Sequence, residues 1–315
     1  MNLLIGAVTM GLILAPLALG VFISYRVYHT LDLTVDGSFG VGAAVVAAML
    51  VREVPPVPAT VLAMLAGAIA GAVTGVLHTR FLVSALLAGV LTSTAFYSIS
   101  LFIMGSGNVS LATADSLVNL ADRLGRSLLG LPDSLTLFDT SVSGANVASL
   151  VIVALLVIGL VFGLARFLGT DLGLAMRAAG HNPQMARAVS IDVNLMIVLG
   201  LGLSNGLIAL SGALQAQYEG FANIQMGIGA VVTGVATLMV GETLMGKRRL
   251  GRWIAGAAVG AVVFRLLVAL AIRAGLNPNA LKLVTALFVL AVLVVPTVVR
   301  KYRQRRPTVG APTHA

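Results

Sequence analysis

Long apolar runs alternate with short polar stretches along this chain. A helix that crosses a hydrocarbon core of roughly 30 Å needs about 20 consecutive apolar residues. The pattern therefore predicts an all-α, polytopic membrane protein with about nine transmembrane helical segments. The segments are expected near residues 3–25, 33–51, 58–77, 81–104, 146–168, 193–216, 226–245, 253–273 and 279–299.

The first two apolar runs are joined by an unusually polar stretch. Asp32, Thr34, Asp36 and Gly37 interrupt a helix and offer caps to the next one. Irregular backbone is tolerated inside a membrane only where protein or a water-filled cavity covers it. We therefore expect at least one broken helix here, with Asp32 and Asp36 near a translocation path. The alternative is a short cytoplasmic turn in which the Asp residues only cap the second segment.

The third segment carries glycines at four-residue spacing, Gly67, Gly71 and Gly75. Such spacing opens a flat face on which another helix can pack closely. The same spacing recurs in the sixth and eighth segments. We expect these glycines to serve packing within the bundle.

A second polar stretch, residues 169–192, has the pattern of two short helices. Asp171 is predicted to cap the first helix, which is expected to end at Gly180 in a left-handed conformation. Asn182 is predicted to cap the second helix, with Pro183 at its first position, where a missing N–H has no cost.

Met185 and Val189 are spaced i and i+4, so they share one face of the second helix, with Arg187 turned elsewhere. A helix-turn-helix of this size at a membrane surface suits insertion into a groove of another protein. The alternative is an ordinary cytoplasmic loop.

Hydropathy falls between residues 105 and 145, the longest polar insertion in the chain. Leucine and alanine recur at helical spacing over residues 117–131, which predicts an amphipathic helix along the outer membrane face. Either it receives an external binding protein, or it only covers the helix bundle.

The basic residues set the expected orientation, because cytoplasmic loops carry an excess of Lys and Arg. If residues 169–192 are cytoplasmic, that side holds 14 of the 20 Lys and Arg, and the outer side holds four. The N-terminus is then outside and the C-terminus cytoplasmic. We expect one transmembrane domain, residues 1–300, and a basic tail, residues 301–315, that anchors to anionic lipid.

Composition agrees with a membrane protein and excludes several other classes. A hydrophobic fraction of 58%, a charged fraction of 10% and a mean hydropathy of +1.03 exclude a soluble domain of 315 residues. The net charge of +9 is explained by topology, so it does not indicate a nucleic-acid partner. With no Cys and four scattered His residues, no metal site is expected.

One stretch nearly matches a phosphate-binding loop, from Gly241 to Arg248. The position that needs Ser or Thr for magnesium is Arg248, and the stretch follows a membrane segment instead of a strand. No nucleophile and base pair up elsewhere, so the chain is predicted not to be an enzyme and to bind no cofactor. Glu242 is expected to cap or to pair with the cations between Lys247 and Arg252.

Polar residues inside the sixth, seventh and eighth segments are candidates for a translocation path, because such groups need partners in a bundle interior. Arg265 lies well inside its segment, where it either attracts an anionic substrate group or pairs with an internal acid or carbonyl. The candidates are Ser204, Asn205, Gln215, Thr233, Thr237 and Arg265.

The motif Arg177-Ala-Ala-Gly-His-Asn-Pro, followed by the stretch from Ala186 to Ile191, resembles the coupling loop of a family of ABC-transporter permeases. The family is the branched-chain amino acid and ribose importer superfamily, most closely its uncharacterised branch paired with lipoprotein-type binding proteins. The stretches from Leu31 to Gly40 and from Ser204 to Gly246 also resemble it. One departure is Ser190, where the superfamily usually has Gly.

The resemblance implies a permease subunit of an ABC importer in the bacterial cytoplasmic membrane. A separate ATPase would bind ATP and magnesium, an external binding protein or lipoprotein would deliver substrate, and a second permease copy would complete the path. The substrate would be an amino acid or a similar small polar metabolite. The alternative is a secondary transporter driven by an ion gradient. The implied ATPase-coupling residues are Asp171, Met176, Arg177, Gly180, Asn182, Pro183, Met185, Arg187 and Val189.

Overall fold

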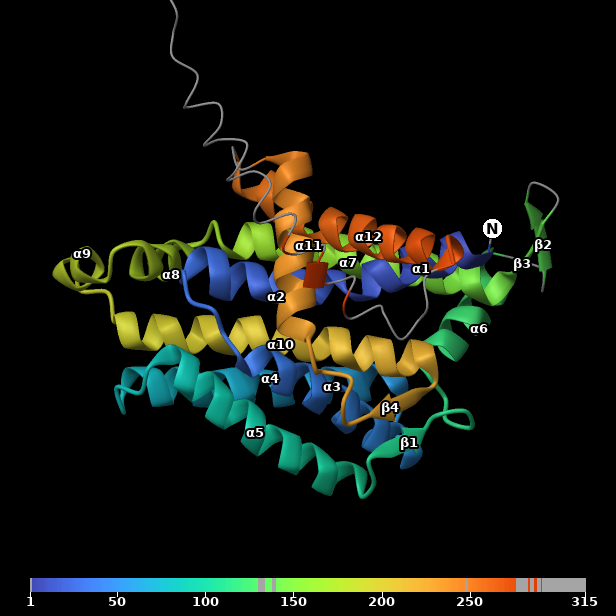
Figure 1. Cartoon of the computed structure of the whole chain (residues 1–315), viewed down its shortest axis with the longest axis horizontal. Helices are drawn as coiled ribbons and strands as arrows, with labels where there is room; N and C mark the ends of the chain where they lie inside the picture. The colour runs from blue at the N-terminus through green and yellow to red at the C-terminus, as the bar shows by residue number, and fades with distance from the viewer. Residues whose placement is uncertain are drawn as a thin grey trace, which may run out of the picture.

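The computed structural model describes residues 2–129, 134–137, 140–246 and 249–275, together with positions 283, 286, 287 and 290. The fold of this part of the chain is a bundle of long helices with short helices and strands at its two ends (Figure 1). The α-helices are α1 (Asn2–Ile13), α2 (Ala15–Phe22), α3 (Thr34–Val51), α4 (Pro56–Thr79), α5 (Ala85–Met104), α6 (Leu117–Leu129), α7 (Gly144–Phe167), α8 (Asp171–His181), α9 (Pro183–Ala188), α10 (Val193–Glu219), α11 (Ala230–Met245) and α12 (Leu250–Arg273), with a π-helix, η1 (Ile23–Val27), after α2.

The prediction of a helical, multi-pass membrane protein is confirmed. Within the described residues, seven helices are long and apolar enough to cross a membrane. They are Leu4–Val27, Thr34–Val51, Pro56–Thr79, Ala85–Met104, Asn146–Phe167, Val193–Glu219 and Leu250–Arg273. The ninth predicted segment, 279–299, and the basic tail, 301–315, lie outside the continuously described residues.

The predicted segment 226–245 differs from a full membrane span. Turns occupy residues 224–229, and α11 has only 16 residues. In Figure 1, α11 crosses the long helices at a steep angle, and its first residues, Ala230 and Val231, are buried. The chain is thus broken here, where Gly229 has φ 89° and Gly227 packs against the backbone of α3, as well as between η1 and α3. The prediction that Asp36 and Gly37 interrupt a helix is wrong, because both lie inside α3.

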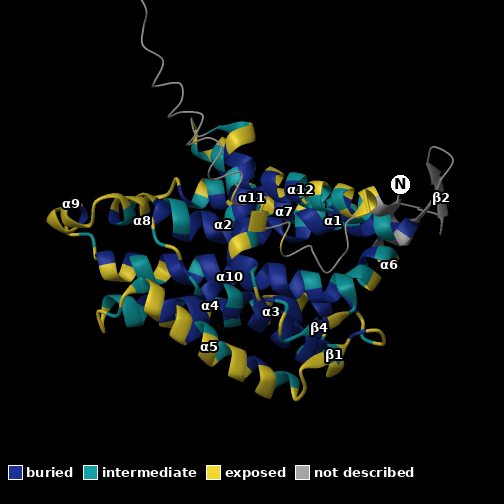
Figure 2. Ribbon diagram, in the orientation of Figure 1, coloured by how far each residue is buried: buried dark blue, intermediate teal, exposed yellow. Residues whose placement is uncertain are grey.

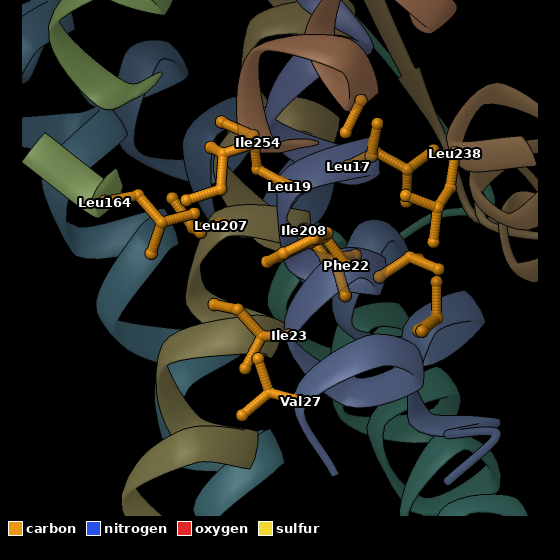
Figure 3. Close-up of a cluster of buried hydrophobic side chains, with 14 of the residues drawn as sticks. Leu17, Leu19, Phe22, Ile23, Val27, Leu164, Leu207, Ile208, Leu238 and Ile254 are labelled. Carbon is orange, nitrogen blue, oxygen red and sulfur yellow. The ribbon is translucent and has the colours of Figure 1, made fainter. Parts of the chain in front are cut away.

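The apolar core lies around α2 and η1, which are surrounded by other helices. Phe22, Ile23 and Leu17 are fully buried and contact side chains from α7, α10, α11 and α12, as Figure 3 shows. The share of buried residues differs among the spans. It is 83% for α3 but 22% for α5 (Figure 2). The apolar faces that α5 and α7 leave exposed are suited to lipid or to another transmembrane subunit.

Glycines let α4 and α10 approach each other closely, as their four-residue spacing predicts. A Cβ at Gly67 or Gly71 would overlap backbone oxygens of α10, and one at Gly75 would lie 2.8 Å from Cα of Val198. Gly241 of α11 and Gly260 of α12 provide the same close approach between their helices. The predicted packing role of these glycines is confirmed.

We expect Gly71→Ala to destabilise the bundle by about 2 kcal/mol, because a methyl group cannot fit against Leu201 without moving α4 from α10. Gly159→Ala is the matched control, since a Cβ at Gly159 in α7 meets nothing within 4 Å. Thermal unfolding in detergent measures both. Equal midpoints for the two variants would contradict the close packing of α4 on α10.

The end of the bundle next to α6 carries four short strands, which an all-α prediction misses. β1 (Asn108–Ser110) pairs antiparallel with β4 (Phe221–Asn223), and β2 (Ser134–Leu137) pairs with β3 (Thr140–Ser143). The predicted amphipathic helix is confirmed as α6, where Arg123 forms an exposed ion pair with Asp115 at 3.1 Å. The pairing of β1 with β4 ties the loop after α5 to the loop before α11.

Candidate functional site

The two helices predicted at residues 169–192 are present as α8 and α9, at the end of the molecule opposite to α6 (Figure 1). The predicted cap of the first helix is wrong by one residue. Thr170 caps α8, and its Oγ1 accepts a hydrogen bond from the Gly173 N–H at 3.4 Å. Asp171 instead lies in the first turn, where its carboxylate favourably faces the helix dipole.

Gly180 does not end α8 in a left-handed conformation, so that prediction is wrong. The helix continues to His181, and a Cβ at Gly180 would overlap the carbonyl oxygen of Val27. Gly180 is therefore a contact point between α8 and η1. Sequence alone misses this role because the neighbour is about 150 residues away in the chain.

The predicted start of α9 is confirmed. The Asn182 Oδ1 accepts a hydrogen bond from the Met185 N–H at 3.1 Å, and Pro183 occupies the first helical position. After α9, Ser190 adopts φ 63°, the left-handed region that favours glycine. The chain after α9 thus adopts a backbone conformation that is typical of glycine, although the residue is a serine.

The two helices expose some predicted coupling residues and bury others. Met185 of α9 is 66% exposed, and Val189, the C-cap residue just after α9, is 61% exposed. Ala186 is buried and holds α9 to the rest of the chain, and Met176 is likewise buried under α8. Arg177 and Arg187 are exposed. The segment therefore presents two exposed apolar residues at its tip, and most of its surface is exposed (Figure 2).

Asp32 lies in a buried polar network near the start of α3. Its Oδ1 accepts a hydrogen bond from the Thr34 N–H at 2.8 Å, and its Oδ2 accepts one from the Asn205 Nδ2 at 2.7 Å. Ser38 donates to the Asn205 Oδ1 at 2.7 Å, and the hydroxyls of Thr34 and Thr74 are 2.8 Å apart. The structure thus brings two predicted path residues together and joins α3, α4 and α10 through them.

Asp36 caps α11, a helix almost 200 residues later in the chain. Its Oδ1 accepts a hydrogen bond from the Val231 N–H at 2.9 Å, and its Oδ2 accepts one from the Gly229 N–H at 3.2 Å. A carboxylate at this place satisfies free backbone donors and faces the positive end of the helix dipole. Asp36 therefore fixes the broken helix to α3.

Arg265 lies within electrostatic reach of the Glu219 carboxylate, although no ion pair joins the two within the described residues. The Gln215 Nε2 donates to the Glu219 Oε1 at 2.8 Å. The side chains of Tyr218 and Thr9 lie close by. These residues join α1, α10 and α12 in one polar cluster.

The remaining path candidates are bonded to backbone. Ser204 donates to the Gly20 carbonyl oxygen at 2.7 Å, whereas Thr233 and Thr237 donate to carbonyls within their own segment. In the part of the chain that the structure describes, no three His, Asp or Glu side chains are grouped as metal ligands.

A cluster that sequence reasoning misses lies where η1 meets α11 and α12. Arg26 forms an ion pair with Glu242 at 2.5 Å, and the Trp253 Nε1 donates to the same carboxylate at 2.9 Å. The rings of Trp253 and Phe22 meet edge to face at 5.2 Å. The sequence predicts that Glu242 caps or pairs with the cations between Lys247 and Arg252, and the structure adds Arg26 of the first span as an ion-pair partner.

Tyr28, next to this cluster, donates its hydroxyl to the Met196 carbonyl of α10. Burial raises the pKa of the Tyr28 hydroxyl above its ordinary value, so the group stays a neutral donor.

Comparison with known proteins gives a consistent result over nearly the whole chain. The sequence profile of the family described as "Branched-chain amino acid transport system / permease component" matches residues 3–295. The chain is 36% identical to the tyrosine transport system permease protein of Clostridioides difficile, over 93% of this chain and 91% of that protein.

Two further relatives also match most of this chain. An uncharacterized protein of Rickettsia prowazekii is 32% identical over 90% of this chain and 94% of its own length. The ribose import permease protein of Haemophilus influenzae is 24% identical over 75% of this chain and 67% of that protein. No solved structure matches.

Proposed function

Because this chain belongs to the family of branched-chain amino acid transport permeases, we propose that α8 and α9 are the segment through which its ATPase drives transport. The chain is the transmembrane permease subunit of an ABC importer, a multi-pass protein of the bacterial plasma membrane. Its family implies an ATP-binding subunit and a substrate-binding protein as partners. ATP and magnesium then bind to the ATPase, and this chain hydrolyses nothing.

The observation that carries the proposal is the exposed apolar pair on α9. Met185 of α9 and its C-cap residue Val189 are each more than half exposed, whereas Ala186 is buried against the rest of the chain. Burial of such a tip in an apolar groove lowers the free energy, because apolar surface is removed from water. Asp171, Arg177, Asn182 and Arg187 set the shape of the segment and supply polar contacts around the tip.

Movement of α8 would reach the interior through its contact with η1. Gly180 packs against the backbone of Val27, and η1 leads directly into the chain before Asp32. A shift of α8 driven by the ATPase is thereby transmitted to the polar network and to Asp36, which holds α11. In this proposal the N-terminus is outside, the α8 and α9 end is cytoplasmic, and the basic tail contacts anionic lipid.

The proposed path runs beside the broken helix, between α3, α10 and α11. A second copy of the chain would enclose it from the other side and cover part of the exposed apolar face of α5. The proposed path residues are Asp32, Asp36, Ser204, Asn205, Gln215, Thr233, Thr237 and Arg265.

We propose an amino acid as the substrate, delivered by a binding protein of the lipoprotein type. Support comes from the relative named for tyrosine transport, which aligns over more than nine-tenths of both chains. Uptake of labelled tyrosine and of branched-chain amino acids by reconstituted transporter separates these substrates. Uptake that does not depend on ATP would instead favour a transporter driven by an ion gradient.

The double substitution Met185→Asp with Val189→Asp is expected to abolish co-purification of the ATPase, because it places two charges in an apolar contact. The matched control is Met185→Leu with Val189→Ile, which keeps the tip apolar and is expected to retain the ATPase. Both variants should fold, since the two side chains are exposed. Retention of the ATPase by the Asp variant would show that this tip is not the docking site.

A further inference from the structure

A cavity of about 670 Å³ lies beside α8, where η1 and the start of α12 approach it. Arg26, His29, Arg177 and His181 line it, together with apolar and aromatic side chains that include Trp253. The cavity is at the end of the bundle that carries α8 and α9. It borders the segment assigned to coupling without including the tip of α9.

The side chains around this cavity are strongly biased toward positive charge and hydrogen-bond donors. Among the described residues none that lines the cavity is acidic, and the nearest carboxylate, Glu242, bonds to Arg26 and Trp253. Arg26 donates one guanidinium nitrogen to Glu242, while its Nε has no hydrogen-bond partner within the described residues. Guanidinium groups only donate, and an imidazole offers at least one N–H in either charge state. The lining therefore suits an anion with several acceptor oxygens.

The helix that carries two of the lining residues is held in place by packing. One face of α8, with Met176 and Gly180, packs against the protein, which holds Arg177 and His181 at the cavity. His29 is held at φ 55°, a left-handed conformation that non-glycine residues rarely adopt, with its ring centroid 6.4 Å from that of His181. A strained residue beside a cavity is frequent at binding sites.

We propose that this cavity binds a phosphate group, carried by an anionic phospholipid or by a soluble phosphate compound. Arginine matches the geometry of phosphate oxygens, and its charge-assisted hydrogen bonds are about twice as strong as neutral ones. The aromatic wall of Phe22 and Trp253 suits the glycerol and upper acyl region of a lipid. Because Arg177 and His181 belong to α8, the bound group stabilises the orientation of the coupling segment.

The sequence contains a single tryptophan, Trp253, and it lines this cavity, so its fluorescence reports binding directly. The full-length permease in neutral detergent is titrated with short-chain phosphatidylglycerol, short-chain phosphatidylcholine and inorganic phosphate. We expect a saturable change with phosphatidylglycerol. The Arg177→Gln, His181→Gln variant should bind about tenfold more weakly, because two donors to the phosphate are altered.

Arg80→Gln is the control variant, because Arg80 is an exposed cation outside the cavity lining. It should titrate like the wild type. A response to inorganic phosphate that competes with phosphatidylglycerol identifies a soluble ligand, and a response to phosphatidylglycerol alone identifies a lipid.

The proposal is wrong if phosphatidylcholine and phosphatidylglycerol act alike, or if the double variant responds as the wild type does. It is also wrong if no anion changes the fluorescence. Acidic residues of the ATPase would then become the candidate occupant of the cavity. Co-purification of the ATPase is measured separately, so failure here leaves the role of Met185 and Val189 unaffected.

Discussion

Replacing Asp32 by alanine is expected to lower the free energy of unfolding by about 3 kcal/mol, because buried donors lose their acceptor. The change removes a hydrogen bond to the start of α3 and another to Asn205 of α10, both in a site where Asp32 is only 4% exposed. At this low exposure, water has little access to the donors that lose their acceptor. Unfolding in mixed micelles titrated with sodium dodecyl sulfate measures the loss.

Exchanging Asp32 and Asn205 tests whether the hydrogen bond between them accounts for the loss of stability. Asp32→Asn alone turns an amide donor toward the Asn205 amide, and Asn205→Asp alone places two carboxylates together. The double substitution Asp32→Asn with Asn205→Asp restores one donor and one acceptor, so it should recover part of the loss. If the double variant is no more stable than either single variant, the network does not hold α3 to α10 in this way.

Local sequence patterns predict much of the coupling segment because its geometry is set by neighbouring residues. The cap at Asn182 and the exposure of Met185 and Val189 follow from short-range rules. The choice between Thr170 and Asp171 as cap cannot be made from sequence, since both residue types cap helices well. The seven spans are predictable for the same local reason, because each corresponds to an apolar run of sufficient length.

The partners of the buried polar residues could not be predicted, because each pairing joins helices far apart in the chain. Asp32 meets Asn205, Arg26 meets Glu242, and Arg265 lies beside Glu219. A single sequence shows that such residues need partners but not which partners they find. The shortness of α11 escapes prediction because its apolar residues continue the run that begins at residue 226.

Replacing Asp36 by alanine is expected to free the N-terminus of α11. Asp36 accepts hydrogen bonds from the Gly229 and Val231 N–H groups, and loss of a helix cap costs about 1–2 kcal/mol. A loss of this size raises local opening of the first turn by about tenfold. The chain has no cysteine, so Thr233→Cys, one turn into α11, reports that opening through its rate of labelling by a water-soluble maleimide.

The labelling rate should therefore rise about tenfold when Asp36→Ala is added to Thr233→Cys. Asp36→Asn keeps one acceptor oxygen, so its labelling rate should lie between those of Asp36 and Asp36→Ala. An amide caps a helix without the attraction of a full charge to the helix dipole. Asp115→Ala is the control, since Asp115 is an exposed carboxylate paired with Arg123 at the α6 end of the bundle. An unchanged rate in the Asp36→Ala variant would mean that the turns at residues 224–229, and not this carboxylate, hold α11 in place.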